Sequence, residues 1–293
     1  MEAQVQDIDL EVSHEILMPR EQTLPLVLSS PHSGDRYPPT FLASSRLDPM
    51  MLRRSEDSFV DELFAEAPRM GAPLLRALFP RAYVDPNREP FELDPAMFED
   101  RLPDYANTRS PRVAAGLGTI PRIVANGADI YGEKLLFSDA LSRLRGHYWP
   151  YHTALSRLIE VTAKRFGYCV LIDCHSMPSA GKSKNGGAPP CVDMVLGDCH
   201  GGACAAVVAD TAARCLKTLG YSVARNRPYS GGHVTRYYGN PSQSVHAIQV
   251  EINRALYMDE HRIRRSTSMT RVAQNMQHFL SALAAIDNGL LMA

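Results

Sequence analysis

The stretch YCVLIDCH spans residues 168–175 and decides how this chain is expected to fold. Its first seven residues form a nearly continuous apolar run of strand length, which is typical of a central parallel strand covered on both faces. His175 follows the run directly. We therefore expect His175 at the carboxyl end of a central strand, which is where ligands bind in open α/β sheets.

Further strands and helices are expected on both sides of this stretch. The segments that read as strands are 24–30, 73–79, 81–85, 192–196, 221–225 and 247–252. The segments that read as helices are 55–70, 133–165 with a break at Trp149-Pro150, 202–219 and 259–286. Residues 92–121 read as a long functional loop. The alternation predicts a mostly parallel sheet with helices on both faces, and no boundary divides residues 1–293 into two domains.

Composition excludes several classes of protein. Of the 293 residues, 45% are hydrophobic and 22% are charged, which fits a packed globular chain. The formal net charge of −1 gives no general attraction to nucleic acid or to an anionic membrane. No window reaches the roughly 20 apolar residues of a membrane helix, and the N-terminus lacks a signal-peptide pattern, so we predict a cytoplasmic protein.

The cysteines do not indicate a disulfide scaffold or a thiolate zinc site, because no CxxC spacing occurs. They are found at positions 169, 174, 191, 199, 204 and 215. We read Cys169 and Cys174 as small buried residues of a strand.

Two histidines at strand ends favour a metal site. His32 follows the strand at 24–30 within Pro31-His32-Ser33-Gly34, and His175 follows the strand at 168–174. A catalytic zinc usually takes three nitrogen or oxygen ligands from the protein and leaves one position for water. We favour Asp57 as the third ligand, while Asp35 and Glu56 stay open as candidates. Histidine and carboxylate ligands suit zinc best, although another divalent metal is compatible with them.

Glu251 is the candidate general base. It lies in AIQVEINR, an apolar strand in which an unpaired carboxylate would be costly. One explanation is that Glu251 accepts a proton from water whose pKa a divalent metal has lowered to about 7. The alternative is a structural ion pair with Arg254.

Cationic side chains near other strand ends are candidates for substrate binding. Arg88 follows Asn87 and offers two parallel hydrogen bonds to a carboxylate, although a solvated arginine is the plain alternative. Residues 231–236 (GGHVTR) read as a flexible loop that brings Gly232, Thr235 and Arg236 towards an anionic group, although an ordinary turn also fits.

Taken together, these segments resemble the N-formylglutamate amidohydrolase family, which is distantly related to zinc carboxypeptidases and aspartoacylase. The resemblance covers roughly residues 24–260 and rests on several motifs in one order. They are SSPHSG at 29–34, RRSEDSFVDELF at 53–64, AYVDPNREP at 82–90, GTIPRI at 118–123, IDCHSMP at 172–178, GGHVTRYYG at 231–239 and IQVEINRALYM at 248–258.

The resemblance implies a three-layer α/β/α fold with a mixed, mostly parallel central sheet, like that of zinc carboxypeptidases. It also implies one zinc ion and hydrolysis of N-formyl-L-glutamate to formate and L-glutamate in histidine degradation. It suggests His32 and His175 as metal ligands and Glu251 as the general base. Those peptidases place a ligand glutamate three residues after the first histidine, where this chain has Asp35, so Asp57 remains our inference.

The resemblance also suggests roles in substrate binding. Asn87-Arg88 resembles the Asn-Arg dipeptide that holds a substrate carboxylate in the related carboxypeptidases. A dicarboxylate substrate requires a second cation, for which Arg236 and Arg254 are the candidates, and we expect Arg122 to stabilise the oxyanion. Two alternatives stay open: an amidohydrolase or carboxypeptidase acting on another N-acyl amino acid or short peptide, and a metal-free binding protein. Loop 178–191 is either a lid or an inert surface loop.

Overall fold

A mixed sheet of seven strands forms the centre of the computed structural model, which describes residues 12–124, 127–179 and 192–292. The strand order is β1-β3-β2-β4-β7-β5-β6. The strands are β1 His14–Leu17, β2 Leu26–Ser30, β3 Leu74–Ala77, β4 Cys169–Met177, β5 Met194–Gly197, β6 Val223–Arg225 and β7 Val245–Asn253. A separate hairpin pairs β8 Met258–Asp259 with β9 Arg264–Arg265.

Most neighbouring strands of the sheet run parallel. β3, β2, β4 and β7 form the parallel centre, β1 pairs antiparallel with β3, and β5 pairs antiparallel with β7. β4 and β7 pair over their whole lengths, which sets His175 directly opposite Glu251. The carboxyl ends of the central strands therefore lie at one edge of the sheet and carry the residues singled out above.

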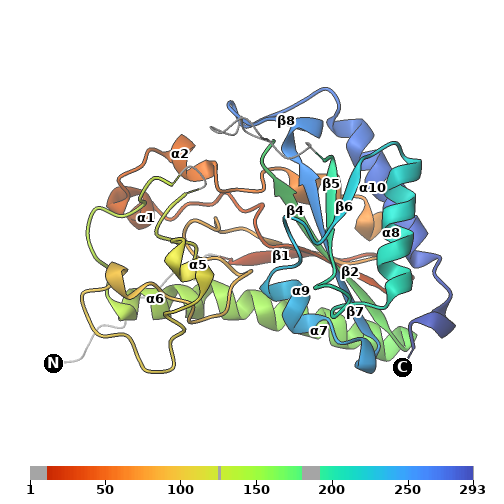
Figure 1. The fold of residues 1–293 in the computed structure, drawn as a ribbon, viewed down its shortest axis with the longest axis horizontal. Coiled ribbons are helices and arrows are strands. Elements are labelled where there is room, and N and C mark those ends of the chain that lie inside the picture. Colours follow the sequence, from red (N-terminus) through yellow and green to blue (C-terminus); the bar gives the residue numbers. More distant parts are fainter. Residues whose placement is uncertain (1–11, 125–126, 180–191, 293) are drawn as a thin grey trace.

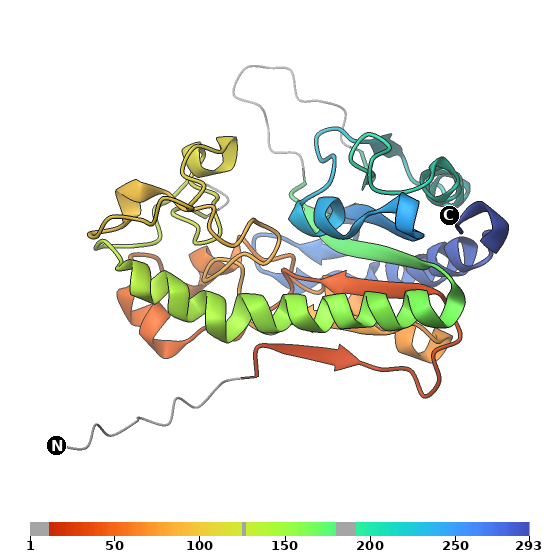
Figure 2. The ribbon, with the colours of Figure 1, turned by 90° about the horizontal axis from the view of Figure 1, so that it is seen from below.

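Helices cover both faces of the sheet (Figure 1). The α-helices are α1 Pro39–Ser44, α2 Pro49–Arg53, α3 Val60–Leu63, α4 Ala67–Met70, α5 Pro111–Ala114, α6 Phe137–Arg143, α7 Trp149–Phe166, α8 Ala206–Thr218, α9 His233–Tyr238 and α10 Met269–Ala284. The 3₁₀ turns are η1 Pro95–Met97, η3 Pro241–Gln243, η4 Arg254–Leu256 and η5 Asn288–Leu290, and η2 Leu144–Tyr148 is a π-helical segment. Figure 2 shows α7 running across one face of the sheet.

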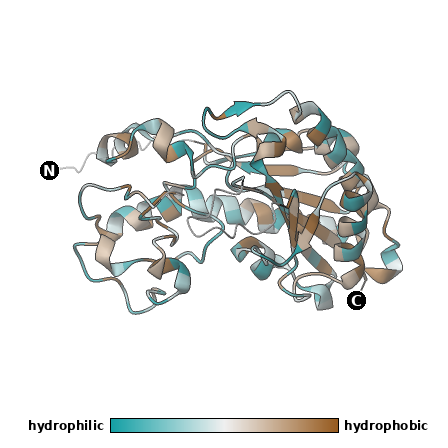
Figure 3. Cartoon of the chain, turned by 45° about the horizontal axis from the view of Figure 1, so that its top comes forward, coloured by the Kyte–Doolittle hydropathy of each residue, from teal (hydrophilic) through white to brown (hydrophobic). Residues whose placement is uncertain are grey.

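Alternate residues of the strands build two cores, one on each face. Ile172 and Cys174 of β4 pack in the cluster that contains residues of α3, α8 and α10. Leu171, which directly precedes Ile172, packs on the opposite face in the cluster that contains residues of α7. All three side chains are fully buried, and burial of a leucine or isoleucine side chain contributes about 1.5–3 kcal/mol. Figure 3 shows this arrangement as hydrophobic strands at the centre of the molecule.

A third hydrophobic cluster lies apart from the sheet. It contains Phe41 of α1, Leu52 of α2 and residues of the long connections, Ala82, Val124 and Ile130. In Figure 1 the helices α1, α2 and α5 lie together on the left, beyond the strands. This loop-rich part contributes side chains to the cavity described below.

The predicted fold class, a three-layer α/β/α arrangement around a mostly parallel mixed sheet, is confirmed. The edge strand β1 had not been expected from the sequence. The predicted break at Trp149-Pro150 is not found, because the π-helical segment η2 joins α6 directly to α7 and Pro150 lies in the first turn of α7, where its missing N–H is tolerated. That residues 1–293 form a single domain stays a prediction.

Three segments differ from their predicted secondary structure. Residues 55–70 form two short helices, α3 and α4, because Phe59 has a φ of 68° and Pro68 begins a new turn. Residues 81–85 form a turn rather than a strand, with the Val84 N–H donating to Pro80 O. The last helix begins at Met269 rather than at residue 259, because the β8–β9 hairpin occupies the preceding residues.

Strand ends and loops also differ in detail. β4 continues to Met177 and β7 continues to Asn253, so His175 and Glu251 lie inside strands near their carboxyl ends. Residues 233–238, expected as part of a flexible loop, form α9.

The cysteines that the structure describes are free thiols, and Cys169 and Cys174 are buried as predicted. Cys191 and most of loop 178–191 lie outside the described residues. No helix within residues 12–124, 127–179 and 192–292 is both long and apolar enough to cross a lipid bilayer.

Candidate active site

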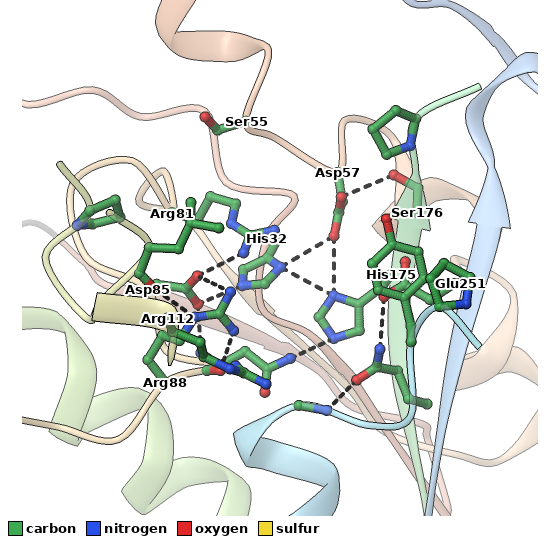
Figure 4. Close-up of a pocket in the computed structure, with 18 of the residues that line it drawn as sticks. His32, Ser55, Asp57, Arg81, Asp85, Arg88, Arg112, His175, Ser176 and Glu251 are labelled. Atoms are coloured by element: carbon green, nitrogen blue, oxygen red, sulfur yellow. Dashed lines mark hydrogen bonds and ion pairs between the residues drawn. The ribbon is translucent and has the colours of Figure 1, made fainter. Parts of the chain in front are cut away.

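A cavity of about 410 Å³ lies at the carboxyl ends of the central strands, a volume typical of small-molecule sites. Eight of the predicted site residues line it: His32, Asp57, Asn87, Arg88, His175, Gly232, Glu251 and Arg254. Figure 4 shows the side chains that converge there. The predicted residues Arg122, Thr235 and Arg236 are not part of its lining.

The two histidines and Asp57 meet on the wall of this cavity. Asp57 Oδ2 lies 3.2 Å from His32 Nδ1 and 3.1 Å from His175 Nδ1, and the two Nδ1 atoms are 3.1 Å apart. The Asp57 N–H also donates to His32 O at 3.0 Å, so the backbone holds these two segments together. All three side chains are at least 97% buried.

A carboxylate stands behind each imidazole. His32 Nε2 lies 2.7 Å from Asp85 Oδ1, and His175 Nε2 lies 2.9 Å from Asp173 Oδ1. Carboxylates in this position fix the orientation of a ligand histidine and leave its other nitrogen available for a metal. The Nδ1 atoms of both rings are therefore the nitrogen atoms available to a metal, and they face each other and Asp57.

Opposite charges keep the acidic groups of the cluster ionised. Burial alone would raise the pKa of Asp57, but hydrogen bonds with His175 and His32 and the charges of His32 and Arg254 hold that pKa well below its usual value. Asp85 behaves in the same way, because Arg81 and His32 outweigh the effect of burial and lower its pKa. Asp57 thus presents a charged oxygen to the space between the histidines.

The chemistry of this donor set fits a divalent metal. Zinc ligands at about 2.0–2.2 Å in a tetrahedral arrangement stand roughly 3.3 Å from one another, close to the spacing between the three donor atoms here. Of the three acidic candidates, Asp57 is the one found with the histidines. Glu56 instead bonds Arg53, Ser58 and Tyr37, and the Asp35 side chain is 65% exposed.

Glu251 lies on β7 beside His175 of β4 and is 6% exposed. Gln249 Nε2 donates to Glu251 Oε1 at 2.7 Å, and Gln249 Oε1 in turn accepts from the Gly232 N–H at 2.6 Å. Burial raises the pKa of Glu251 to about 7, an effect that the positive charge of His175 partly offsets. A carboxyl group with such a pKa can accept and release a proton near neutral pH.

The alternative of an ion pair between Glu251 and Arg254 is not what the structure describes. Arg254 Nη2 donates to Asp57 Oδ1 at 3.0 Å, and Arg254 Nε donates to Ser176 Oγ at 3.1 Å. Ser176 Oγ donates to the same Asp57 oxygen at 3.0 Å. Arg254 therefore supports the carboxylate of the histidine cluster.

Asn87 and Arg88 lie next to the cluster. Asn87 Nδ2 is 3.0 Å from His175 Nε2, and Asn87 Oδ1 accepts from the Val234 N–H at 2.8 Å. Arg88 donates from Nε to Leu117 O at 2.9 Å and from Nη1 to Asn87 O at 2.8 Å. Burial and the neighbouring cations Arg81 and Arg112 lower the pKa of Arg88 to about 10, against the attraction of Asp85.

Three predicted residues have other surroundings. Arg122 pairs with Asp94 at 3.3 Å and with Asp129 at 2.8 Å. Thr235 is fully buried, and its hydroxyl donates to Asp173 Oδ2 at 3.0 Å, so it stands behind His175. Arg236 is exposed on α9.

Other lining residues had not been singled out in the sequence: Arg81, Asp85, Arg112 and Gln249. Gln249 lies two residues before Glu251 on the same strand and therefore shares its face, which is a periodicity that the sequence contains. Arg81 and Asp85 lie six and two residues before Asn87 in the chain. Nothing in the local sequence distinguishes Arg112, which lines the cavity, from an arginine on the protein surface.

Comparisons with known proteins give one consistent result. Residues 24–258 match the family described as N-formylglutamate amidohydrolase. An N-formylglutamate deformylase of Pseudomonas aeruginosa is 32% identical over 249 residues, which are 84% of this chain and 86% of that protein. A protein of the same name from Pseudomonas putida is 30% identical over 240 residues, or 81% and 83% of the two chains.

Solved structures agree with this result. The crystal structure of N-formylglutamate amidohydrolase from Ralstonia eutropha JMP134 is 34% identical with a TM-score of 0.88, covering 95% of this chain and 100% of that one. A gene product of Agrobacterium tumefaciens is 18% identical with a TM-score of 0.65, covering 94% and 97%, and shares the fold.

Proposed function

The chain belongs to the N-formylglutamate amidohydrolase family, and we propose that it hydrolyses N-formyl-L-glutamate to formate and L-glutamate in the cavity at the sheet edge. The family resemblance read from the sequence, and the amide-hydrolysing class that it implied, are thereby confirmed. The use of zinc, the place in histidine degradation and the cytoplasmic location remain our predictions.

One observation carries the proposal. Two imidazole nitrogens and a carboxylate oxygen, contributed by residues 32, 57 and 175, lie within 4.8 Å of one another in a cavity that also contains Glu251. We assign His32, Asp57 and His175 as ligands of one divalent metal, with zinc favoured by the donor types. A metal bound there would supply Lewis acidity and lower the pKa of water.

Glu251 is the proton carrier in this proposal. Its Oε1 is occupied by the Gln249 amide, so we assign Oε2 as the atom that takes a proton from the attacking water. Passing this proton to the departing nitrogen completes the hydrolysis, which yields formate and the free amino group of L-glutamate. Burial favours this cycle because it raises the pKa of the carboxyl to about 7.

The charges of the cavity suit an anionic substrate. Its lining contains four arginines, Arg81, Arg88, Arg112 and Arg254, against three carboxylates, Asp57, Asp85 and Glu251. A divalent metal would add to this positive excess. We assign Asn87 and Arg88 to the α-carboxylate of the substrate, because both line the cavity and Asn87 Nδ2 lies 3.0 Å from His175 Nε2.

The cation near the oxyanion was expected to be Arg122, which pairs with Asp94 and Asp129 away from the cavity lining. Arg81 is the better candidate. It lines the cavity and donates from Nη2 to Asp85 Oδ2 at 2.7 Å, one contact away from His32.

Formate release tests the proposal directly. The purified protein is assayed with N-formyl-L-glutamate and N-acetyl-L-glutamate, and its metal content is measured on the same sample. We expect formate release at a higher kcat/KM than acetate release, about one metal ion per chain, and loss of activity after chelation that added zinc restores. Acetate release that exceeds formate release would reassign the acyl group, and full activity without metal would refute the site.

A further inference from the structure

Arg112 is the arginine of the cavity lining whose guanidinium has no hydrogen bond or ion pair with any residue in the described part of the chain. The other three are engaged. Arg81 bonds Asp85, Arg254 bonds Asp57, and Arg88 bonds two backbone carbonyls. Arg112 is only partly exposed, so it is not an ordinary solvated surface arginine.

The backbone holds Arg112 in a fixed relation to Arg88. Arg88 Nε donates to Leu117 O at 2.9 Å, and the Leu117 N–H donates to Arg112 O at 2.8 Å. Ser110 begins α5 by accepting the Val113 N–H at 3.0 Å and also donates to the buried Glu92. Arg112 is therefore carried by an anchored turn and not by a free loop.

Arg88 and Arg112 line the same cavity, and the charge of Arg112 adds to the effect of burial in lowering the pKa of Arg88. Figure 4 shows both side chains on the same side of His32, with Glu251 beyond His175 on the other side. Arg88 Nη2 lies 3.7 Å from Asp85 Oδ2, whereas Arg112 has no carboxylate partner among the described residues, so Arg112 is the cation better placed to bind an anion that arrives with the substrate.

We infer that Arg112 binds the side-chain carboxylate of the substrate and selects glutamate over uncharged amino acids, an inference that rests on the proposed function. The position of Arg112 favours contact with the side-chain carboxylate of the substrate over contact with the α-carboxylate. Arg81 and Arg88 lie beside Asp85, which contacts His32, whereas Arg112 comes from α5 outside the sheet. The α-carboxylate is attached next to the scissile amide, and the side-chain carboxylate lies farther out.

The test compares two substrates that differ in one charge, N-formyl-L-glutamate and N-formyl-L-glutamine. For Arg112→Met we expect kcat/KM on formylglutamate to fall about 10- to 100-fold, mostly through KM, because a charged contact in the bound state is lost. Turnover of formylglutamine should change less than about threefold. Arg112→Lys should recover part of the preference, because it keeps the charge and loses the paired geometry.

Arg101→Met serves as the matched control. It removes an arginine from the same loop-rich part, and the side chain of Arg101 is 86% exposed. Calorimetry of L-glutamate and L-glutamine binding gives a second readout that does not depend on turnover. We expect Arg112→Met to weaken glutamate binding alone.

Two results would overturn the inference. An unchanged preference for glutamate in Arg112→Met, or equal losses on both substrates, would exclude Arg112 as the side-chain carboxylate site while formate release by the unchanged protein still supported the proposed function. Absence of formate release by the unchanged protein would remove the proposed function itself, and the inference with it.

Discussion

Gln249 donates from its side-chain amide to Glu251 at 2.7 Å while it accepts the backbone N–H of Gly232 at 2.6 Å. The amide is 4% exposed and lies on the same face of β7 as the carboxylate. It therefore fixes which oxygen of Glu251 is free to exchange a proton and connects β7 to the turn before α9.

Replacing Gln249 tests this connection. We expect Gln249→Leu to lower kcat about 10-fold with a smaller change in KM, because the carboxylate loses a buried donor and its fixed orientation. Metal content should stay at the level of the unchanged protein. Gln243→Leu, at an exposed position, is the control. A purely structural role for Gln249 would instead lower the melting temperature and leave kcat per folded molecule unchanged.

Glu251→Gln should keep the metal and lose most turnover, by about 100-fold or more, because the amide cannot accept the proton from water. The measurements are metal content and formate release on the same preparation. Glu21→Gln, which changes a side chain that is 71% exposed, is the control. Near-normal activity would eliminate Glu251 as the base.

Arg88→Ala should weaken the use of formylglutamate about 10- to 1000-fold in kcat/KM, since a charged contact with the α-carboxylate is lost. Metal binding should be retained, because the Arg88 guanidinium makes no hydrogen bond with His32, Asp57 or His175 within the described residues. An equal loss of bound metal would show that Arg88 supports the histidine cluster and would remove its assignment to the substrate.

Gly232→Ala should impair activity through Asn87. A Cβ at position 232 would lie 2.3 Å from Asn87 Nδ2 and 2.4 Å from Asn87 Oδ1, so the buried amide beside His175 has to move. We expect a loss of about 10-fold or more in kcat/KM, consistent with the cost of overpacking. Gly146→Ala is the matched control, because a Cβ there meets no atom of the described residues within 4 Å, apart from its chain neighbours and its own helix backbone. Equal activity of the two variants would contradict the role of this contact.

His147 makes folding stability depend on pH. Burial, followed by the charge of Arg143, lowers the pKa of His147 from 6.5 to about 4 in the folded protein. The unfolded chain therefore binds a proton first as the pH falls, so the stabilisation is complete above about 6.5 and is lost between 6.5 and about 4.

The free energy of unfolding, measured in urea, should fall less between pH 7 and pH 5 in His147→Phe than in the unchanged protein. We expect the difference to be about 1–2 kcal/mol, a value reduced to allow for the partial exposure of the His147 ring. The phenyl ring suits the site because His147 packs against Phe79 and Tyr83 and its Nδ1 has no hydrogen-bond partner among the described residues. His278→Gln, at an exposed position, is the control. An unchanged difference between the two pH values would refute the prediction.

The sequence allowed the central strands and the histidine cluster to be predicted, because both depend on local patterns. The apolar runs before His32 and His175 mark strands that end at the same edge of the sheet, and parallel strands bring such ends together. Asp57 was found by the same reasoning, although the helix on which it was placed is two short helices.

The partners of the arginines could not be predicted, because pairing depends on distances between segments that are remote in the chain. Arg254 lies near Glu251 in sequence but bonds Asp57, which is 197 residues away. Arg122 belongs to a matching motif yet has two nearer carboxylates in its own loop. The antiparallel pairing of β5 with β7 could not be predicted either, because a short apolar run does not specify the direction of its strand.

The pairing of His175 with Glu251 across two parallel strands has a further consequence. Their separation is inherited from the ladder of backbone hydrogen bonds, in which adjacent strands stand about 4.8 Å apart. The turns that carry Arg88 and Arg112 are not bound by that ladder. A change of sequence in these turns can therefore move the arginines that face the substrate while the distance between His175 and Glu251 stays fixed by the sheet.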